Sequence, residues 1–594
     1  MNGGRREMRG RNLIQARILR GVILLLFGVL VVDLFILQIV QHDYYKGQSL
    51  QNRQVQIRVK APRGRFLDRE GRVLADNVYL ADITLPRGAV TEAGPDSTLA
   101  KLLRWFSLPQ DETLDRLREQ KEAGRPRLTL VANADMPRIA TVEERRRELP
   151  GARVEARASR RYKHGPQLAH IIGYVGEVRP EEVGDEDDHR AHQPGDTVGR
   201  EGLEAAWEDE LRGESGLFLK EVNAVGRVVG SRDIPLWPVV PGGDIALTVA
   251  LALQESLMAA MDGRPGAAVA LSLPSGEVLA AVSNPTYDPN LFTRGISSRE
   301  WNRLLDDPQH PFLNRLVQAT YPPGSPYKIV TSLAGLKAEV VGKWTHFEPC
   351  WGSYRFGNRN FRCWRRSGHG DLDHAGGLVH SCDVFYYQLG LRLELEQLRD
   401  VAHMLGLGQE TGSPFAAEVA GNIPDRVWYD EHYGPGRWTR GVLLNNAIGQ
   451  GEILVTPLQM AVLTARVAVN DSDLVPHFRL GGDDASSSAG RPLPLDTGDI
   501  EWLRRTMTRV VDMGTGTRAR LEAIEVAGKT GTAQNPHGED HAWFVCFAPA
   551  SAPVVAFVVI LEHGGHGGAV AAPVAARWLT DFFAWRERSS TGGA

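Results

Sequence analysis

The chain has 594 residues, which is too long for one ordinary domain and suggests about three folded units. Its composition, 42% hydrophobic and 24% charged, excludes a largely disordered protein. The net charge of −4 gives no reason to expect nucleic acid as a partner, and four cysteines are too few for a disulfide-built scaffold.

The first segment predicts a membrane anchor. Residues 1–20 carry six arginines and one glutamate, and an apolar run follows at 21–41. Because roughly 20 apolar residues cross the hydrocarbon core, we expect this run to be a transmembrane helix and not a buried core helix. No small-residue cleavage site follows it, which argues against a signal peptide. The arginines predict a cytoplasmic tail at 1–20, which places the rest of the chain outside the inner membrane, anchored by this single span.

Residues 42–245 are predicted to form the first domain outside the membrane. Its first part, 42–60, is expected to be a juxtamembrane stalk that ends in a short strand, because VQIRV alternates as a strand does. The next part, 61–77, predicts short strands separated by glycine turns at Gly64 and Gly71.

The segments between the predicted strands are expected to form helices and loops. Apolar residues at helical spacing predict amphipathic helices through 97–150, and another short helix at 199–213. The acidic stretch at 177–192 predicts a surface loop, as does the Ser/Gly/Pro-rich stretch at 481–494. Residues 589–594 are expected to be a flexible tail.

Residues 246–588 are predicted to form a second domain around a single sheet. A strand–turn–strand pattern covers 267–283, and a closing helix is expected at 572–585. Three more strand-like runs occur late in the domain, at 524–534, 542–550 and 554–562. Strands from both ends would join in a five-stranded antiparallel sheet with helices on both faces, which makes the chain an α+β multidomain protein.

The first chemical motif is PPGSPYKIV, in which Ser325 and Lys328 are three positions apart. If a helix begins near Ser325, both side chains lie on one face, one turn apart. A serine hydroxyl needs a base, and a lysine can be that base when burial or a second cation lowers its pKa. The free N–H groups of a helix start could support an oxyanion, and Pro326 fits the first helical position. Alone, this pattern is common by chance.

Two further motifs supply the other parts of a serine acyl-transfer site. HSCDVFYYQLG places Ser381 two positions before Asp383, and this serine could relay a proton. AGKTGTA opens a strand-like run with Lys529, which could hold a carboxylate. The residues that follow it are Thr530, Gly531 and Thr532. The glycine would let a substrate approach the backbone, and the last threonine offers an N–H and a hydroxyl.

These three motifs, in this order, are the signature set of penicillin-binding proteins and class A β-lactamases. The chain resembles class B penicillin-binding proteins over nearly its full length, including RGRFLDREGRVLADN (63–77), NPTYDPN (284–290) and NNAIGQGEILVTPLQMA (445–461). Asp383, where asparagine is more usual, makes the chain resemble the penicillin-binding protein 2 branch of that class. Those are the elongation enzymes of rod-shaped Gram-negative bacteria.

The resemblance implies an architecture and a reaction. It implies an elongated pedestal at 42–245 and a transpeptidase domain at 246–588. Ser325 would attack the carbonyl between the two terminal D-alanines of a peptidoglycan stem peptide, and Lys328 would take its proton. Ser381 and Lys529 would help protonate the departing D-alanine, and an amine of a neighbouring stem would resolve the acyl-enzyme into a cross-link. The oxyanion would lie at the N–H groups of Ser325 and Thr532, and β-lactams would leave a stable acyl-enzyme.

The resemblance also implies membrane partners. A SEDS-family glycosyltransferase and other proteins of the elongation complex are expected to contact the span and the pedestal. That contact would give Asp33 and residues 42–77 a role in activation. From the residues alone, Asp33 could face a partner helix or reach water at the outer interface.

The sequence also predicts a structural zinc ion, and no organic cofactor is expected. The candidate metal ligands are Cys350, Cys363, His369 and Cys382. Three thiolates and an imidazole suit zinc, and relatives in the resembled branch can carry zinc near the active site. The spacing leaves alternatives: a Cys350–Cys363 disulfide with Cys382 as a free thiol, three free thiols, or His374 in place of His369. Cys546 is predicted to be a core residue.

Other functions are compatible with parts of these patterns. A division-specific class B transpeptidase would normally carry Ser-x-Asn and no metal-ligand set. A β-lactamase needs a water-activating carboxylate, for which the sequence offers no clear candidate. A penicillin sensor would normally need several spans and an intracellular effector domain, and a non-catalytic scaffold is disfavoured by three intact motifs. We therefore expect a serine-type D,D-transpeptidase of cell elongation.

Overall fold

The computed structural model describes residues 4–90, 94, 96–122, 124–125, 127–184, 190–221, 234–481, 490–536 and 538–591. The chain divides into two compact units. One comprises Met1–Ala61, Glu186–Ala191 and Gly213–Pro241, and the other comprises Pro62–Asp185, His192–Arg212 and Gly242–Ala594.

The first unit holds the predicted membrane span. Helix α1 (Gly4–Phe35) continues through a π-helical turn, η1 (Ile36–Val40), and begins well before residue 21. Within it, Ala16–Val40 is long and apolar enough to cross a membrane, with a mean hydropathy of 2.8. The unit then adds α2 (His42–Arg53) and a three-stranded sheet. The sheet has the order β1 (Gln54–Val59), β8 (Gly216–Glu221), β9 (Ile234–Trp237), and β1 is the strand predicted from VQIRV.

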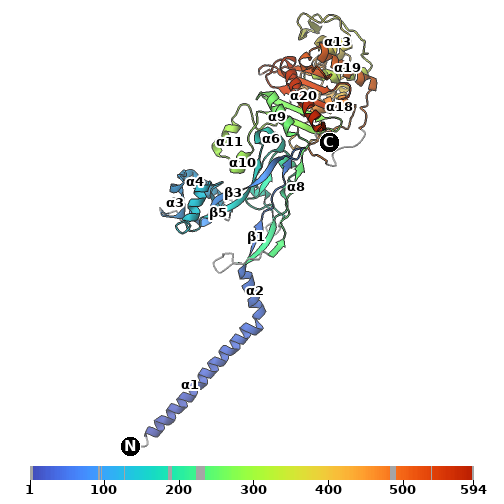
Figure 1. Ribbon diagram of the computed structural model, residues 1–594. Coiled ribbons are helices and arrows are strands. Elements are labelled where there is room, and N and C mark those ends of the chain that lie inside the picture. Colours follow the sequence, from blue (N-terminus) through green and yellow to red (C-terminus); the bar gives the residue numbers. More distant parts are fainter. Residues whose placement is uncertain are drawn as a thin grey trace. The chain divides into compact units, whose positions relative to one another are not determined.

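The second unit begins with a sheet built around one long strand, β3 (Val73–Pro86) (Figure 1). Its other strands are β2 (Phe66–Leu67), β4 (Arg127–Val131), β5 (Arg153–Tyr162) and β10 (Ile245–Ala246). Strand β10 runs parallel to β2 in the order β10-β2-β3-β4, and β5 also pairs with β3. The helices near this sheet are α3 (Thr98–Trp105), α4 (Gln110–Glu122), α5 (Met136–Glu144), α6 (Gly165–Ile172), α7 (Gly202–Ala206) and α8 (Glu208–Arg212).

Two local predictions for this part were wrong. Residues 97–150 are not helical throughout, because β4 lies between α4 and α5 and buries Leu128 and Leu130 against their neighbours. Gly64 is not a turn residue. A side chain there would lie 1.8 Å from the carbonyl oxygen of Gly243, so glycine is needed for close backbone packing. Gly71, with φ +80°, does occupy the predicted turn between β2 and β3.

The catalytic domain is built on the predicted five-stranded antiparallel sheet, in the order β12-β11-β17-β16-β15. Its strands are β11 (Gly266–Ser272), β12 (Val278–Asn284), β15 (Ala527–Ala533), β16 (His541–Ala548) and β17 (Val555–Leu561). Consecutive residues of the central strands enter two different hydrophobic clusters, so both faces are buried. The predicted fold class is confirmed.

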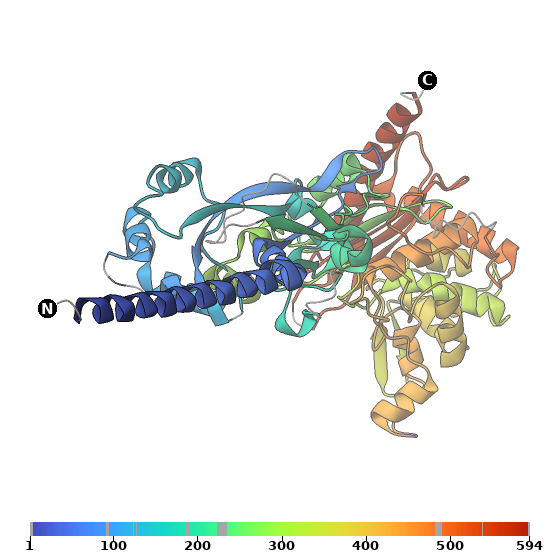
Figure 2. The ribbon, with the colours of Figure 1, turned by 90° about the horizontal axis from the view of Figure 1, so that it is seen from below.

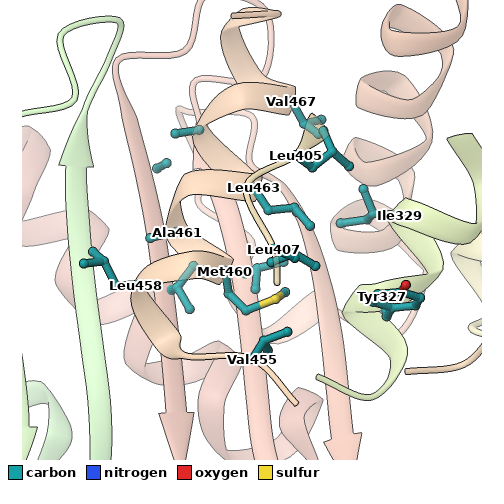
Figure 3. Close-up of a cluster of buried hydrophobic side chains, with 14 of the residues drawn as sticks. Tyr327, Ile329, Leu405, Leu407, Val455, Leu458, Met460, Ala461, Leu463 and Val467 are labelled. Carbon is teal, nitrogen blue, oxygen red and sulfur yellow. The ribbon is translucent and has the colours of Figure 1, made fainter. Parts of the chain in front are cut away.

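Helices cover each face of this sheet. Helices α9 (Leu251–Met261) and α20 (Gly567–Thr591) pack on one face, and α18 (Pro457–Val469) packs on the other. Helix α20 begins before residue 572 and continues to Thr591, beyond the expected start of the tail. Figure 3 shows Met460 and Leu463 of α18 beside Ile329, Leu405 and Leu407, so α18 links the sheet to the helices behind the active site.

The remaining helices lie between β12 and β15 in the sequence. The later ones, yellow to orange in Figure 2, gather beside the sheet, whereas α10 (Asn290–Arg294) packs against β5. The helices of this segment are α10, α11 (Ser298–Leu305), α12 (Lys328–Lys337), α13 (His374–Val379), α14 (Asp383–Gly390), α15 (Leu395–Met404), α16 (Arg426–Tyr433), α17 (Val442–Asn446) and α19 (Thr497–Met513). A short hairpin, β13 (Ser353–Phe356) and β14 (Arg359–Arg362), projects from this segment.

Candidate active site

The predicted nucleophile lies in a tight turn that leads into α12. Ser325 opens a 3₁₀ turn, η4 (Ser325–Tyr327), and Lys328 is the first residue of α12. Gly324 precedes it with φ +59°, and a side chain there would lie 2.7 Å from the carbonyl oxygen of Thr532. The turn therefore sits directly against β15, which brings the first and third motifs together. Ser325 itself is half-buried.

Lys328 is fully buried and joins the first motif to the second. Its Nζ donates to a carboxylate oxygen of Asp383 at 2.7 Å, to the carbonyl oxygen of Ser381 at 2.9 Å and to the Ser381 hydroxyl at 3.2 Å. Such a charged, desolvated group needs partners of this kind, because an unpaired buried ammonium is very unfavourable. The described hydrogen bonds of Lys328 thus run to the second motif.

Lys529 approaches the same hydroxyl from the other side. Its Nζ donates to the Ser381 hydroxyl at 2.9 Å and to the carbonyl oxygen of Thr530 at 3.0 Å. Burial, and then the positive charge of Lys328, hold the pKa of Lys529 well below its ordinary value. Two buried lysines therefore share one hydroxyl and the carboxylate of Asp383, an arrangement that favours one neutral amine.

The substrate-binding candidates lie on an edge strand. Strand β15 pairs only with β16 in the sheet order, so its other edge faces the turn of Ser325. A side chain on Gly531 would lie 2.5 Å from Cδ of Pro326, which explains the glycine between the two threonines. The Thr530 hydroxyl is 2.6 Å from that of Thr515, and Gln450 Nε2 donates to the Thr532 carbonyl oxygen at 3.1 Å. These contacts fix the strand beside Ser325.

The four predicted metal ligands converge. The ligand atoms of Cys350, Cys363, His369 and Cys382 all lie within 4.8 Å of one another. The His369 Nδ1 is 3.5 Å from the sulfur of Cys363 and 3.7 Å from that of Cys350, and all three cysteines are free thiols. Hydrogen bonds from Cys382 and His369 lower the pKa of the Cys363 thiol. Three buried sulfurs and one half-buried imidazole fit the donor set of a structural zinc ion.

Comparison with known proteins identifies the family. A model of the penicillin-binding protein transpeptidase domain matches residues 266–580, and one of the penicillin-binding protein dimerisation domain matches 58–247. A peptidoglycan D,D-transpeptidase MrdA of Acinetobacter baumannii is 32% identical over 95% of this chain and 88% of the relative. The chain belongs to the penicillin-binding protein 2 family.

Solved structures of this family are similar along most of the chain. The complex of penicillin-binding protein 2 with MreC from Helicobacter pylori matches with a TM-score of 0.78 and 26% identity, covering 90% of this chain and 99% of that one. A structure described as the coordination of polymerization and crosslinking by a peptidoglycan synthase complex matches with a TM-score of 0.71 and 29% identity, covering 96% and 98%. The predicted resemblance and the serine acyl-transferase class are confirmed.

Trp364 is a residue of this site that the sequence did not predict. Its backbone N–H donates to the second carboxylate oxygen of Asp383 at 2.9 Å, and its indole Nε1 donates to the carbonyl oxygen of Ser381 at 3.1 Å. The one sequence feature that points to Trp364 is its position directly after Cys363.

The other histidine and cysteine alternatives lie elsewhere. His374 is buried at the start of α13 with its Nε2 3.1 Å from the Ser332 hydroxyl, so it does not join the thiol cluster. Burial lowers the pKa of His374 to about 4. Cys546 is fully buried in β16, as predicted for a core residue.

Proposed function

We propose that the chain is a peptidoglycan D,D-transpeptidase that cross-links stem peptides during lateral elongation of the cell wall. The observation that carries the mechanism is the Ser381 hydroxyl, which lies 3.2 Å from Lys328 Nζ and 2.9 Å from Lys529 Nζ. This hydroxyl can pass a proton between two buried amines beside the turn that presents Ser325. β-Lactams, which resemble the donor stem, inhibit by acylating the same serine.

The first half-reaction forms the acyl-enzyme. Burial and the positive charge of Lys328 lower the pKa of Lys529, so Lys529 gains a proton as Lys328 loses one, and the proton passes through the Ser381 hydroxyl. The neutral Lys328 then takes the Ser325 proton as the serine oxygen bonds to the donor carbonyl carbon. The bond from that carbon to the terminal D-alanine nitrogen breaks, and the nitrogen receives its proton through Ser381. The N–H groups of Ser325 and Thr532 hold the oxyanion.

The second half-reaction forms the cross-link. The amine of a neighbouring stem peptide attacks the acyl carbon and gives up a proton to the lysine pair. The bond from the carbon to the Ser325 oxygen breaks, and the serine regains its proton. The donor carboxylate belongs to the terminal D-alanine and leaves with it in the first half-reaction; until then charged Lys529, with Thr530 and Thr532 on the edge of β15, binds it.

Replacing Ser325 tests this function. In Ser325→Ala, covalent labelling by a fluorescent β-lactam should fall at least about 10⁴-fold, because the reacting oxygen is gone. The measurement is label per chain after gel separation, with the melting temperature as the control for folding. If the wild-type chain and the variant take up equally little label, the catalytic function is wrong and a non-catalytic scaffold or sensor replaces it.

We propose zinc as the ion held by Cys350, Cys363, His369 and Cys382, where it braces the loop that carries Ser381. The ring nitrogen of His369 that faces away from the sulfurs, Nε2, is buried without a hydrogen-bond partner among the described residues. The contacts of Nδ1 with two sulfurs support it as the ligand atom. Zinc would supply a rigid crosslink and no chemical step.

Metal content tests the zinc proposal directly. We expect about one zinc ion per chain in freshly reduced protein and its loss in Cys363→Ser, because a three-ligand site binds far more weakly. Cys546→Ala, which removes a cysteine outside the cluster, is the matched control and should keep the metal. Wild-type protein that contains no zinc would contradict the zinc proposal. Counting the free thiols per chain would then test for a Cys350–Cys363 disulfide.

We propose that the chain is held in the bacterial inner membrane by Ala16–Val40 with its N-terminus in the cytoplasm and its bulk in the periplasm. The arginines of residues 1–20 support this orientation. A SEDS-family glycosyltransferase and other proteins of the elongation complex are the proposed membrane partners. Solved relatives that include an MreC complex and a peptidoglycan synthase complex support partners of this kind.

A further inference from the structure

The hairpin of β13 and β14 presents a basic face to solvent. The strand register pairs Ser353 with Arg362 and Arg355 with Asn360, so both arginines lie on the same face. The opposite face carries Tyr354, Phe356 and Phe361, which pack on the hydrophobic core, and also Arg359, which pairs with Phe356 and lies over the ring of Phe361. The sequence therefore alternates so that the apolar side anchors the hairpin and the exposed side is cationic.

The positive charge of this segment is not balanced locally. Residues 351–370 contain no aspartate or glutamate. Their arginines, all exposed, are Arg355, Arg359, Arg362, Arg365 and Arg366. Within the described parts of the chain, no carboxylate forms an ion pair with any of them. An ordinary solvated face mixes charges of both signs, and like charges on one face of a hairpin are unfavourable without a counter-ion.

The acidic residues that follow the segment are already engaged, and the exposed Glu348 before it forms no ion pair with these arginines among the described residues. Asp371 lies 2.9 Å from His346 Nδ1, and Asp373 caps α13 by accepting from the Gly376 N–H at 2.7 Å. The arginine face is thus left to bind an anion from outside the chain.

This face lies next to the catalytic loop. The carbonyl oxygen of Arg362 accepts a hydrogen bond from the Tyr387 hydroxyl, at 2.9 Å, and Tyr387 is on α14, which begins at Asp383. Two residues after Arg362, the Trp364 N–H binds the Asp383 carboxylate. An extended ligand on the hairpin would therefore be close to the acyl-enzyme.

We propose that the face of Arg355 and Arg362 binds carboxylates of the second substrate, the stem peptide whose amine attacks the acyl-enzyme. This inference rests on the proposed transpeptidase function and assigns the acceptor strand a binding surface. Guanidinium groups bind carboxylates through paired hydrogen bonds, and a peptide strand with several free carboxylates complements a face with several arginines. The donor strand is held separately at β15.

Acyl transfer by the full-length chain in detergent tests the inference. The donor is a thioester analogue of the stem terminus. The acceptors are a synthetic stem peptide with free carboxylates and the same peptide with those carboxylates converted to amides. In the double variant Arg355→Gln/Arg362→Gln, KM for the carboxylate acceptor should rise about fivefold, as two exposed ion pairs allow. KM for the amide acceptor should match that of wild-type protein, and added salt should shrink the difference.

A matched control removes two exposed arginines elsewhere. Arg146→Gln/Arg147→Gln, which lies after α5, should leave both KM values unchanged. Equal KM values for wild-type protein and the hairpin variant, or equal losses with both acceptors, would overturn the inference. If the hairpin variant is still acylated by the donor or by a β-lactam, the proposed function stands and the acceptor-binding inference alone fails. A wild-type chain that is not acylated would overturn both.

Discussion

At the residue scale, Ser381 is the centre of the site. It adopts φ +54°, a left-handed conformation that is unfavourable by about 1–3 kcal/mol for a residue with a side chain. Its carbonyl oxygen accepts from Lys328 Nζ and from the indole of Trp364, at 2.9 and 3.1 Å. These bonds offset the strain and aim the hydroxyl at both lysines. The backbone conformation of one serine therefore places the hydroxyl on which the proposed proton path depends.

This arrangement makes Trp364 a positioning residue that does not itself touch the reacting atoms. In Trp364→Phe the ring remains but the indole N–H is lost, so Ser381 is less firmly held. We expect the rate constant for acylation by a β-lactam to fall about fivefold, the usual worth of one hydrogen bond, with the affinity of the initial complex unchanged. Stopped-flow kinetics with a fluorescent β-lactam separates the two constants.

A second exposed tryptophan provides the control. Trp351→Phe alters an indole on the other side of the β13–β14 hairpin that is 77% exposed, compared with 56% for Trp364, and this variant should be acylated at the wild-type rate. Melting temperatures of both variants should match that of wild-type protein. An unchanged rate constant in Trp364→Phe, or a change in affinity alone, would contradict the positioning role.

At the element scale, strands with a continuous apolar sequence were predictable, and a short strand between charged helices was not. The strands of the catalytic sheet could be found from sequence because β11, β12, β16 and β17 are continuous apolar runs that are buried on both faces. Strand β4 was missed because it is short and lies between two strongly charged helices. Its burial comes from pairing with β3, more than forty residues earlier, and helical spacing cannot reveal that contact.

The same distinction separates the predicted site residues from the missed ones. Ser325, Ser381 and Lys529 are found through motifs whose spacing is local. The contacts of Trp364, Gln450 and Thr515 span 17, 82 and 15 residues and belong to no recurring motif, so no local spacing marks them. The strain at Ser381 was also invisible, because a serine carries no sign of a left-handed backbone.

At the scale of the whole molecule, the pedestal sheet and the catalytic domain are joined by backbone contacts within one compact unit. Strand β10 pairs with β2, and the Arg69 N–H donates to the carbonyl oxygen of Val249 at 3.0 Å. The carboxylate of Asp68 accepts from the Leu251 N–H at 3.3 Å, at the start of α9. The turn between β2 and β3 is therefore fixed to a helix that packs on the catalytic sheet, which gives the pedestal a direct mechanical connection to it.

The proposed membrane partnership makes a separate prediction for the anchor. Replacing residues 21–41 with an unrelated apolar span, and in a second chimera also replacing 42–61, should reduce co-purification with the SEDS-family polymerase and reduce its glycan synthesis. The first replacement removes Asp33, the carboxylate inside the span, and we expect the loss of this residue to weaken binding of the partner most. Acylation of Ser325 by a labelled β-lactam should persist in both chimeras, because both leave Pro62–Asp185 and Gly242–Ala594 intact. Unchanged complex formation and polymerase activity in both chimeras would mean that the partner binds elsewhere on the chain.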